Sequence, residues 1–223
     1  MKIAIICAMS SERALFCSRM TERKDFEING LPYSEGKLSG RDVVVCVSGI
    51  GKVNAAITAQ TVIDRFSPDV VINSGIAGSL SEKAPHLSIV VSDKLSYHDF
   101  DLSIFDNDYP YVSEFSADRS LIEKYFAANF EMKDLVFGNV ATGDQFVTSS
   151  AKKAEIKAKT NALACEMEGA AIAHAAYVNK VPFIVLRCIS DLADDNAEMT
   201  FDEFEQIAAD KVAKTVISLI ASI

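Results

Sequence analysis

The sequence is poor in positive charge. Its 223 residues include 22 lysines and arginines against 31 aspartates and glutamates, which gives a net charge of −9 at pH 7. Proteins that bind the phosphate backbone of nucleic acids need the opposite balance, so we expect no nucleic-acid partner. Apolar residues make up 49% and charged residues 24% of the chain, as in folded globular proteins and unlike disordered ones. At roughly 150 residues per domain, the length leaves one large domain or two small ones open.

Long apolar runs are also absent, and none approaches the roughly 18 residues that a membrane span needs. The segment most like a signal peptide is residues 2–9, but Glu12 and Arg13 follow where a cleavage site would need small residues. We interpret this segment as a strand and expect no membrane association. The five cysteines are odd in number, far apart and mostly within apolar segments, which is typical of buried thiols in a reducing compartment. These features predict a cytoplasmic protein.

Only three histidines occur, His86, His98 and His174. They form no HExxH motif, and no cysteine–histidine cluster has the spacing of a zinc site. The chain also lacks the GxSxG motif of serine hydrolases. The sequence therefore disfavours a metalloenzyme and a serine hydrolase, and we expect neither a metal nor any other cofactor.

Apolar runs rich in β-branched residues alternate with segments of helical period, which predicts an α/β fold. We expect strands at residues 2–9, 41–47, 69–73, 88–92, 135–142, 162–165 and 182–189. Helices are expected at residues 11–20, 52–66, 117–129, 150–159 and 168–179, with a long amphipathic helix at 201–220. Glycines in residues 28–38 indicate short antiparallel strands and turns, so the sheet should be mixed. The five prolines fall at the edges of these elements, and none indicates a domain linker.

Two glycine-rich segments follow expected strands, at residues 48–52 (SGIGK) and 74–79 (SGIAGS). The first resembles a phosphate loop but lacks the leading glycine of GxxxxGK, and Val53 stands where that motif has serine or threonine. The second lacks the spacing of GxGxxG. Either segment could simply permit a tight turn, but both would lie at the carboxyl edge of the sheet, where open α/β folds bind ligands. We therefore expect a small molecule to approach the backbone there.

Acidic residues stand at the ends of several expected strands. Glu12 follows the first strand, Glu166 and Glu168 follow the sixth, and Asp191 follows the seventh. Burial at such a position disfavours the charged form and raises the pKa of a carboxyl group, so that it can act as a general acid near neutral pH. Arg187 lies within an otherwise apolar strand and needs a partner or a ligand. A structural ion pair is the alternative for this arginine.

Eight short segments, in one order along nearly the whole chain, are similar to those of a known family. They are IICAMSSE (5–12), SGIGKV (48–53), NSGIAGSL (73–80), YHDFDLSIF (97–105), TGDQF (142–146), EMEGA (166–170), RCISDLAD (187–194) and TFDEF (200–204). In these segments the sequence resembles the 5′-methylthioadenosine/S-adenosylhomocysteine nucleosidases of the nucleoside phosphorylase superfamily. The resemblance implies a single nucleosidase domain over residues 1–223, a three-layer sandwich with a central mixed β-sheet flanked by helices. It also implies a homodimer.

The resemblance further implies that water cleaves the bond between adenine N9 and ribose C1′ of a 5′-substituted adenosine. Departing adenine gains negative charge, and Asp191 matches the family's proton donor to adenine N7. The ribosyl group becomes oxocarbenium-like, and Glu12 matches the base that activates the attacking water. Arg187 would be the third catalytic residue. Two carboxyl groups with opposite duties follow the general logic of glycoside hydrolysis.

The same resemblance implies a nucleoside pocket. Glu168 matches the residue that accepts hydrogen bonds from the ribose hydroxyls, and Phe146 matches the one that stacks on adenine. Further ligand contacts are expected from the backbone of Met167 and of Val147, from Gly78 and from Ser190. An apolar wall for the 5′-thioether would consist of Met9, Ile50 and Phe201, and a neighbouring subunit would add Leu102 and Phe105. For these last five residues, packing in the hydrophobic core is the alternative.

Two positions depart from the family pattern. Ile76 stands where a serine is often found, which removes a polar contact near the sugar or the water, and Cys7 stands where glycine is expected. Two other functions stay open, a phosphate-dependent purine nucleoside phosphorylase and a non-catalytic nucleoside-binding protein. A phosphorylase needs cationic or backbone donors for its phosphate, whereas this loop offers Glu12, and Arg13 is expected on the surface. The preferred substrate also stays open among methylthioadenosine, S-adenosylhomocysteine, 5′-deoxyadenosine and an aminofutalosine-type nucleoside.

Overall fold

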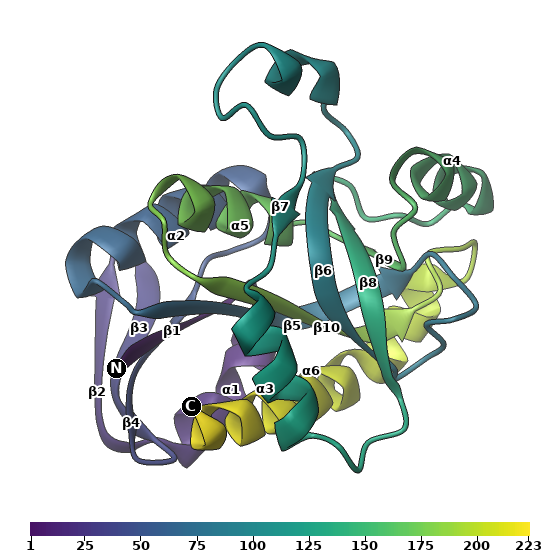
Figure 1. Cartoon of the computed structure of the whole chain (residues 1–223). Helices are drawn as coiled ribbons and strands as arrows, with labels where there is room; N and C mark the ends of the chain where they lie inside the picture. The colour runs from purple at the N-terminus through teal and green to yellow at the C-terminus, as the bar shows by residue number, and fades with distance from the viewer.

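A mixed β-sheet forms the centre of the computed structural model, which describes residues 1–223 (Figure 1). Its strands are β1 (Lys2–Cys7), β2 (Thr21–Ile28), β3 (Leu31–Leu38), β4 (Arg41–Val47), β5 (Val70–Ser79), β6 (Ile89–Tyr97), β7 (Phe115–Ser116), β8 (Leu135–Thr142), β9 (Ala164–Glu166) and β10 (Phe183–Asp191). The helices are α1 (Ser10–Arg19), α2 (Lys52–Phe66), α3 (Arg119–Ala128), α4 (Ser150–Thr160), α5 (Gly169–Val178), α6 (Ala197–Ser222) and a short 3₁₀ helix, η1 (Leu102–Asp106). Parallel and antiparallel pairs both occur, which confirms the predicted mixed sheet.

Helices cover both faces of the sheet (Figure 1). On one face α2 packs against α5, and on the other α6 packs against α1, α3 and β10. This arrangement is the predicted three-layer α/β sandwich, and one hydrophobic core extends through its layers. None of the helices combines the length and the hydropathy that crossing a bilayer requires.

Parallel strands at the middle of the sheet position the candidate site. β5 pairs in parallel with both β1 and β10, and its ten residues are all buried, as expected for a strand covered on both faces. β10 also pairs with β6, and β9 joins β8 to β5, so that five strands close into a ring. The carboxyl ends of β1, β5 and β10 therefore meet at one edge of the sheet.

The glycine-rich segment at residues 74–79 is the second half of β5 and not the turn that its glycines suggested. It keeps its register with β10 as far as Ala77, and Gly75 lies opposite Arg187. A Cβ atom on Gly75 would overlap both the Arg187 guanidinium and the Glu12 carboxylate. This glycine therefore makes room for two charged side chains, which is the use that a glycine inside a strand often has.

Other element boundaries also depend on pairing partners. β6 continues to Tyr97, beyond the expected end at residue 92, because it pairs with β8 and with the short β7. β2 was not predicted, since nearly all of its side chains are exposed and show no apolar alternation; its pairing with β3 holds it in the sheet. The predicted bounds of α2, β4 and β8 are confirmed, whereas α6 begins at Ala197 instead of residue 201.

Candidate active site

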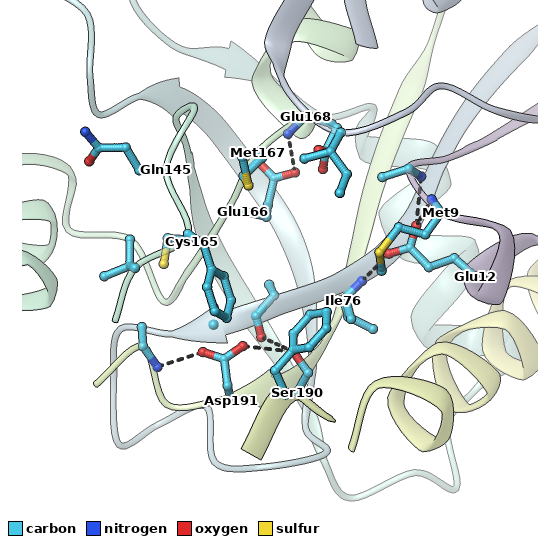
Figure 2. Close-up of a pocket in the computed structure, with 18 residues that line it drawn as sticks. Met9, Glu12, Ile76, Gln145, Cys165, Glu166, Met167, Glu168, Ser190 and Asp191 are labelled. Carbon is cyan, nitrogen blue, oxygen red and sulfur yellow. Dashed lines mark hydrogen bonds between the residues drawn. The ribbon is translucent and has the colours of Figure 1, made fainter. Parts of the chain in front are cut away.

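A cavity of about 340 Å³ opens where the carboxyl ends of β1, β5, β9 and β10 meet the loops before α2 and after β8. This size and position are typical of a small-molecule site in an α/β fold. Eleven predicted site residues line it: Met9, Glu12, Ile50, Gly78, Phe146, Val147, Met167, Glu168, Ser190, Asp191 and Phe201. Figure 2 shows Glu12 and Asp191 on different sides of the cavity, and Glu166 and Glu168 on a third. The structure therefore brings together residues from both ends of the chain.

Glu12 is buried at the start of α1, directly after β1. Its Oε2 atom accepts the backbone N–H groups of Ala8 at 2.7 Å and Met9 at 3.0 Å, and its Oε1 atom accepts the N–H of Ile76 at 3.0 Å. Burial raises the pKa of the Glu12 carboxyl, although the charge of Arg187 and these three hydrogen bonds oppose the shift. A fixed carboxylate with a raised pKa is suited to accept a proton at the cavity wall.

Arg187 lies just behind the cavity wall and does not line it. The side chain is 1% exposed, and its Nη2 atom donates to Asn73 Oδ1 at 2.6 Å and to Glu166 Oε2. Its Nε and Nη1 atoms have no partner within the protein. Burial opposes the charged form, but Glu166, Glu168 and Glu12 together raise the pKa of Arg187. The guanidinium is therefore a fixed cation, with Nη1 facing Glu12 over Gly75.

Glu168 precedes α5 and is 5% exposed. Its Oε1 atom accepts the backbone N–H of Gly51 at 2.9 Å, and its Oε2 atom lies 3.8 Å from Arg187 Nη2. Burial and the charge of Glu166 raise the pKa of Glu168 to about 8, against the opposing charge of Arg187. This carboxyl group can therefore change its protonation state near neutral pH.

Asp191 ends β10, where the register against β5 shifts by one residue and turns its side chain into the cavity. Its Oδ1 atom accepts the backbone N–H of Ala193 at 2.8 Å, and its Oδ2 atom accepts the Ser190 hydroxyl at 3.0 Å. Burial raises the pKa of Asp191, while these two hydrogen bonds work against the rise. The sequence prediction of a buried acid with a raised pKa at this strand end is confirmed.

Apolar and aromatic side chains form the rest of the wall. Phe146 is 45% exposed, and its ring meets that of Phe201 edge-on, with 5.5 Å between the ring centroids. Sequence reasoning missed Gln145 and Cys165, which also line the cavity. The only sequence signal for Gln145 is its place in the TGDQF segment, which matches the family. Cys165 directly precedes Glu166, the first residue of the acidic pair Glu166 and Glu168. No group of three or more histidine, cysteine or acidic side chains is arranged to hold a metal ion.

Leu102 and Phe105 lie outside this cavity. Both belong to η1, which Figure 1 shows on a segment that projects from the sheet. Phe105 is buried against Phe100, with ring centroids 4.9 Å apart, and against Tyr97. The two residues therefore take no part in the site of their own chain.

Comparison with known proteins shows the family. The model of the phosphorylase superfamily matches residues 2–221. The chain is 37% identical to the 5′-methylthioadenosine/S-adenosylhomocysteine nucleosidase of Staphylococcus aureus strain JH9, over 99% of this chain and 100% of the relative.

Solved structures agree with this result. The nucleosidase of the same name from Neisseria meningitidis, in complex with methylthio-immucillin-A, superimposes with a TM-score of 0.94 at 36% identity, over 100% of this chain and 99% of that one. The futalosine hydrolase of Helicobacter pylori superimposes with a TM-score of 0.93 at 32% identity, over 100% and 98% of the two chains. The chain therefore belongs to the phosphorylase superfamily and, within it, to the family of the 5′-methylthioadenosine/S-adenosylhomocysteine nucleosidases.

Proposed function

We propose that this chain, acting as one nucleosidase domain over residues 1–223, hydrolyses the N9–C1′ bond of 5′-methylthioadenosine, S-adenosylhomocysteine and related 5′-substituted adenosines. The relatives from S. aureus and N. meningitidis carry the name of this activity. The observation that carries the proposal is the pair of buried carboxyl groups, Glu12 and Asp191, both with raised pKa values and on different sides of one cavity. Such a pair can perform opposite proton transfers on one substrate.

Asp191 is the general acid of the proposed reaction. Its raised pKa favours the protonated form, and the Ser190 hydroxyl and the Ala193 N–H fix the direction of the carboxyl group. The proton passes to adenine N7 as the electron pair of the N9–C1′ bond moves onto the base. Protonation of this leaving group removes the negative charge that would otherwise oppose cleavage.

Glu12 is the general base, with Arg187 beside it. It takes a proton from the water whose oxygen adds to C1′, so that the products are adenine and the free sugar. The three backbone N–H groups that bind Glu12 keep its carboxylate at the cavity wall, and the unpaired Arg187 Nη1 faces it. This geometry supports a water held between an acceptor and a cation.

The remaining predicted contacts divide by chemistry along the cavity. Glu168 offers a carboxylate to the ribose hydroxyls, next to the backbone of Met167. The half-exposed ring of Phe146 offers a face to adenine, beside the backbone of Val147. Gly78 and Ser190 complete the wall near Asp191, and the apolar group of Met9, Ile50 and Phe201 suits a 5′-thioether.

A phosphorylase is the weaker alternative for this site. The cavity lining contains four acidic residues, Glu12, Glu166, Glu168 and Asp191, and no lysine or arginine to bind a phosphate dianion. Arg13 was expected on the surface, but its side chain is partly buried. It donates a hydrogen bond to Ser34 and lies 3.7 Å from Asp25. It does not line the cavity.

Assembly and location complete the proposal. A homodimer would bring the segment that carries Leu102 and Phe105 of one subunit to the cavity of the other; neither residue lines the cavity of its own chain, and Phe105 is buried there. The five cysteines are all unpaired and buried, which supports a cytoplasmic, reducing environment.

Adenine release from 5′-methylthioadenosine tests the proposal. The purified protein should release adenine without phosphate and form methylthioribose, and added phosphate should leave rate and product unchanged. Release that requires phosphate and yields the sugar 1-phosphate would establish the phosphorylase. If adenine is released in neither buffer, nucleoside binding without catalysis is the remaining function. Because one structural relative is a futalosine hydrolase, the same assay with a futalosine-type nucleoside determines how far the 5′-substituent can vary.

A further inference from the structure

Glu166 is a buried carboxylate without a part in the proposed reaction. It ends β9 and is 7% exposed, at the back of the cavity lining. Its Oε2 atom accepts the backbone N–H groups of Glu168 at 3.0 Å and Gly169 at 2.6 Å (Figure 2 shows the first), together with the Arg187 guanidinium. Its Oε1 atom accepts the hydroxyl of Thr142. Four donors from three elements therefore fix this carboxylate.

The contact with Glu166 sets the direction of Arg187. The guanidinium binds the protein only through Nη2, which Asn73 and Glu166 share. Asn73 is itself held, since its amide donates to Ile6 O at 2.9 Å. With Nη2 fixed from two sides, Nη1 is left toward Gly75 and Glu12.

The same carboxylate fixes the start of α5. It binds two N–H groups of the first turn, where a negative charge is favourable. Thr142 supports it from β8 and accepts the N–H of Ala170 at 2.8 Å. Glu168, the expected ribose acceptor, sits on the backbone that Glu166 holds.

Three carboxyl groups, those of Glu166, Glu168 and Glu12, surround the one cation of Arg187. Glu166 is in contact with the guanidinium, whereas the Glu168 carboxylate lies 3.8 Å away and Glu12 lies across Gly75. Arg187 lowers the pKa values of both Glu12 and Glu168 against the effect of burial, and the negative charge of Glu166 helps to raise that of Glu168. Glu168, with a pKa of about 8, can therefore exchange a proton near neutral pH.

We propose that Glu166 is a positioning residue: as the fixed counter-ion of Arg187, it aims that guanidinium at Glu12 and leaves Glu12 and Glu168 free to exchange protons during the reaction. The inference rests on the proposed function. The titratable groups that face this cluster are Cys7 from β1, Glu12 from α1, Tyr97 from β6, Cys165 from β9, and Glu168 before α5. Burial raises the pKa of each thiol and of the phenol, so their neutral forms add no charge near pH 7.

The test is the pH profile of kcat for adenine release, measured for the wild type and for Glu166→Gln, Glu166→Asp and Thr142→Val. Loss of the Glu166 charge strengthens the pull of Arg187 on Glu12 and Glu168, so the acid limb of Glu166→Gln should move to lower pH by about one unit or more. Its kcat should fall by at least about 10-fold, because the base is weaker and the cation is misplaced. Glu166→Asp keeps the charge and should keep the acid limb, with a lower kcat.

Thr142→Val keeps every charge and removes the hydroxyl that donates to Glu166 and accepts the N–H of Ala170. It should lower kcat by several-fold with KM nearly unchanged and no downward movement of the acid limb. Glu123→Gln, the same change on an exposed helix position, is the control and should match the wild type. A folded Glu166→Gln with the wild-type profile would overturn the proposal; if that variant does not fold, a Thr142→Val protein with wild-type kcat would do so. An inactive wild type would instead contradict the proposed function.

Discussion

The backbone N–H of Gly51 donates to Glu168 Oε1 at 2.9 Å, which joins the loop before α2 to the residue before α5. This bond occupies one oxygen of the expected ribose acceptor. The second oxygen faces Arg187 at 3.8 Å. Glu168 is therefore held ready at the cavity wall while it keeps the pKa of about 8 that burial and Glu166 impose.

The free energy of unfolding of the ligand-free protein should fall as the pH rises toward 8. Burial raises the pKa of Glu168 to about 8, so the folded state keeps a proton that the unfolded chain, with a pKa of about 4.3, has already released. This stabilisation is complete below the unfolded value and is lost as the pH passes the folded one. Glu168→Gln should remove the part of the slope near pH 8. Melting temperatures at a series of pH values check this, and an unchanged slope in the variant would contradict the assignment.

Asp191→Asn should fold normally and lose turnover, because an amide cannot give a proton to adenine N7. General-acid catalysis contributes about 10²–10⁴-fold, so adenine release should fall by this factor. Asp194→Asn makes the same change three residues later, outside the cavity lining, and should keep turnover within about 3-fold. Near-wild-type activity of Asp191→Asn would remove this residue from the role.

Glu12→Gln should separate binding from turnover. The amide keeps the shape of the side chain, and its oxygen can still accept the N–H of Ala8 or Ile76, but it cannot accept a proton from water. Titration calorimetry with an uncleavable adenosine analogue should give nearly the wild-type affinity, while adenine release is lost. Loss of both together would assign Glu12 to the binding of the nucleoside instead.

The sequence predicts the elements whose signal lies within their own residues. It does not predict elements that depend on pairing with another segment. The bounds of α2 follow from its apolar period and the glycine before it, whereas the strand at Thr21–Ile28 has no apolar face and depends on its pairing with β3. The glycines of β5 predict a turn because glycine is common in turns. Gly75 leaves room for Arg187 and Glu12, and this role depends on side chains from two distant segments of the chain.

Some residues of the candidate site can likewise be predicted from the sequence, and others cannot. Asp191 and Glu12 are recognisable because an acid at the end of an apolar strand is costly and needs a reason. Asn73 and Thr142 carry no such signal, since a polar residue in a strand predicts nothing about its partner. Their contacts with Arg187 and Glu166 arise only when β5, β8, β9 and β10 close into a ring.

A polar clamp holds the loop that carries Phe146, and its loss should raise KM more than it lowers kcat. Asp144 accepts the N–H of Lys52 at 2.7 Å, while its own N–H donates to Asp99 at 2.8 Å, and Lys52 pairs with Asp99. Removing a helix cap costs about 0.5–2 kcal/mol, so Asp144→Ala should raise KM by roughly 2- to 30-fold.

Asp118→Ala is the matched control for the clamp. Asp118 caps α3 by accepting the N–H of Leu121 at 2.9 Å, away from the cavity, so its loss should lower the melting temperature without a change in KM. Steady-state kinetics of both variants make the comparison. Equal KM values for the two would show that the clamp does not position the base-stacking loop.

The shared site of the proposed homodimer can be tested by complementation. Leu102 and Phe105 lie on the projecting segment around η1, and Tyr109 and Tyr111 of the same segment are 65% and 67% exposed, an apolar surface that suits a second copy. Leu102→Asp should weaken the dimer in sedimentation and lose activity, because the charge would enter the partner's cavity.

Mixing inactive Leu102→Asp with inactive Asp191→Asn should restore adenine release. In a mixed dimer, the Leu102→Asp subunit keeps its own Asp191 and receives an intact Leu102 from its partner, so one of the two sites works. With random exchange of subunits, about a quarter of all sites should be active. Leu102→Ala gives the same test if the aspartate blocks assembly. A mixture no more active than the sum of its parts, or a monomeric wild type with full activity, would contradict the shared site.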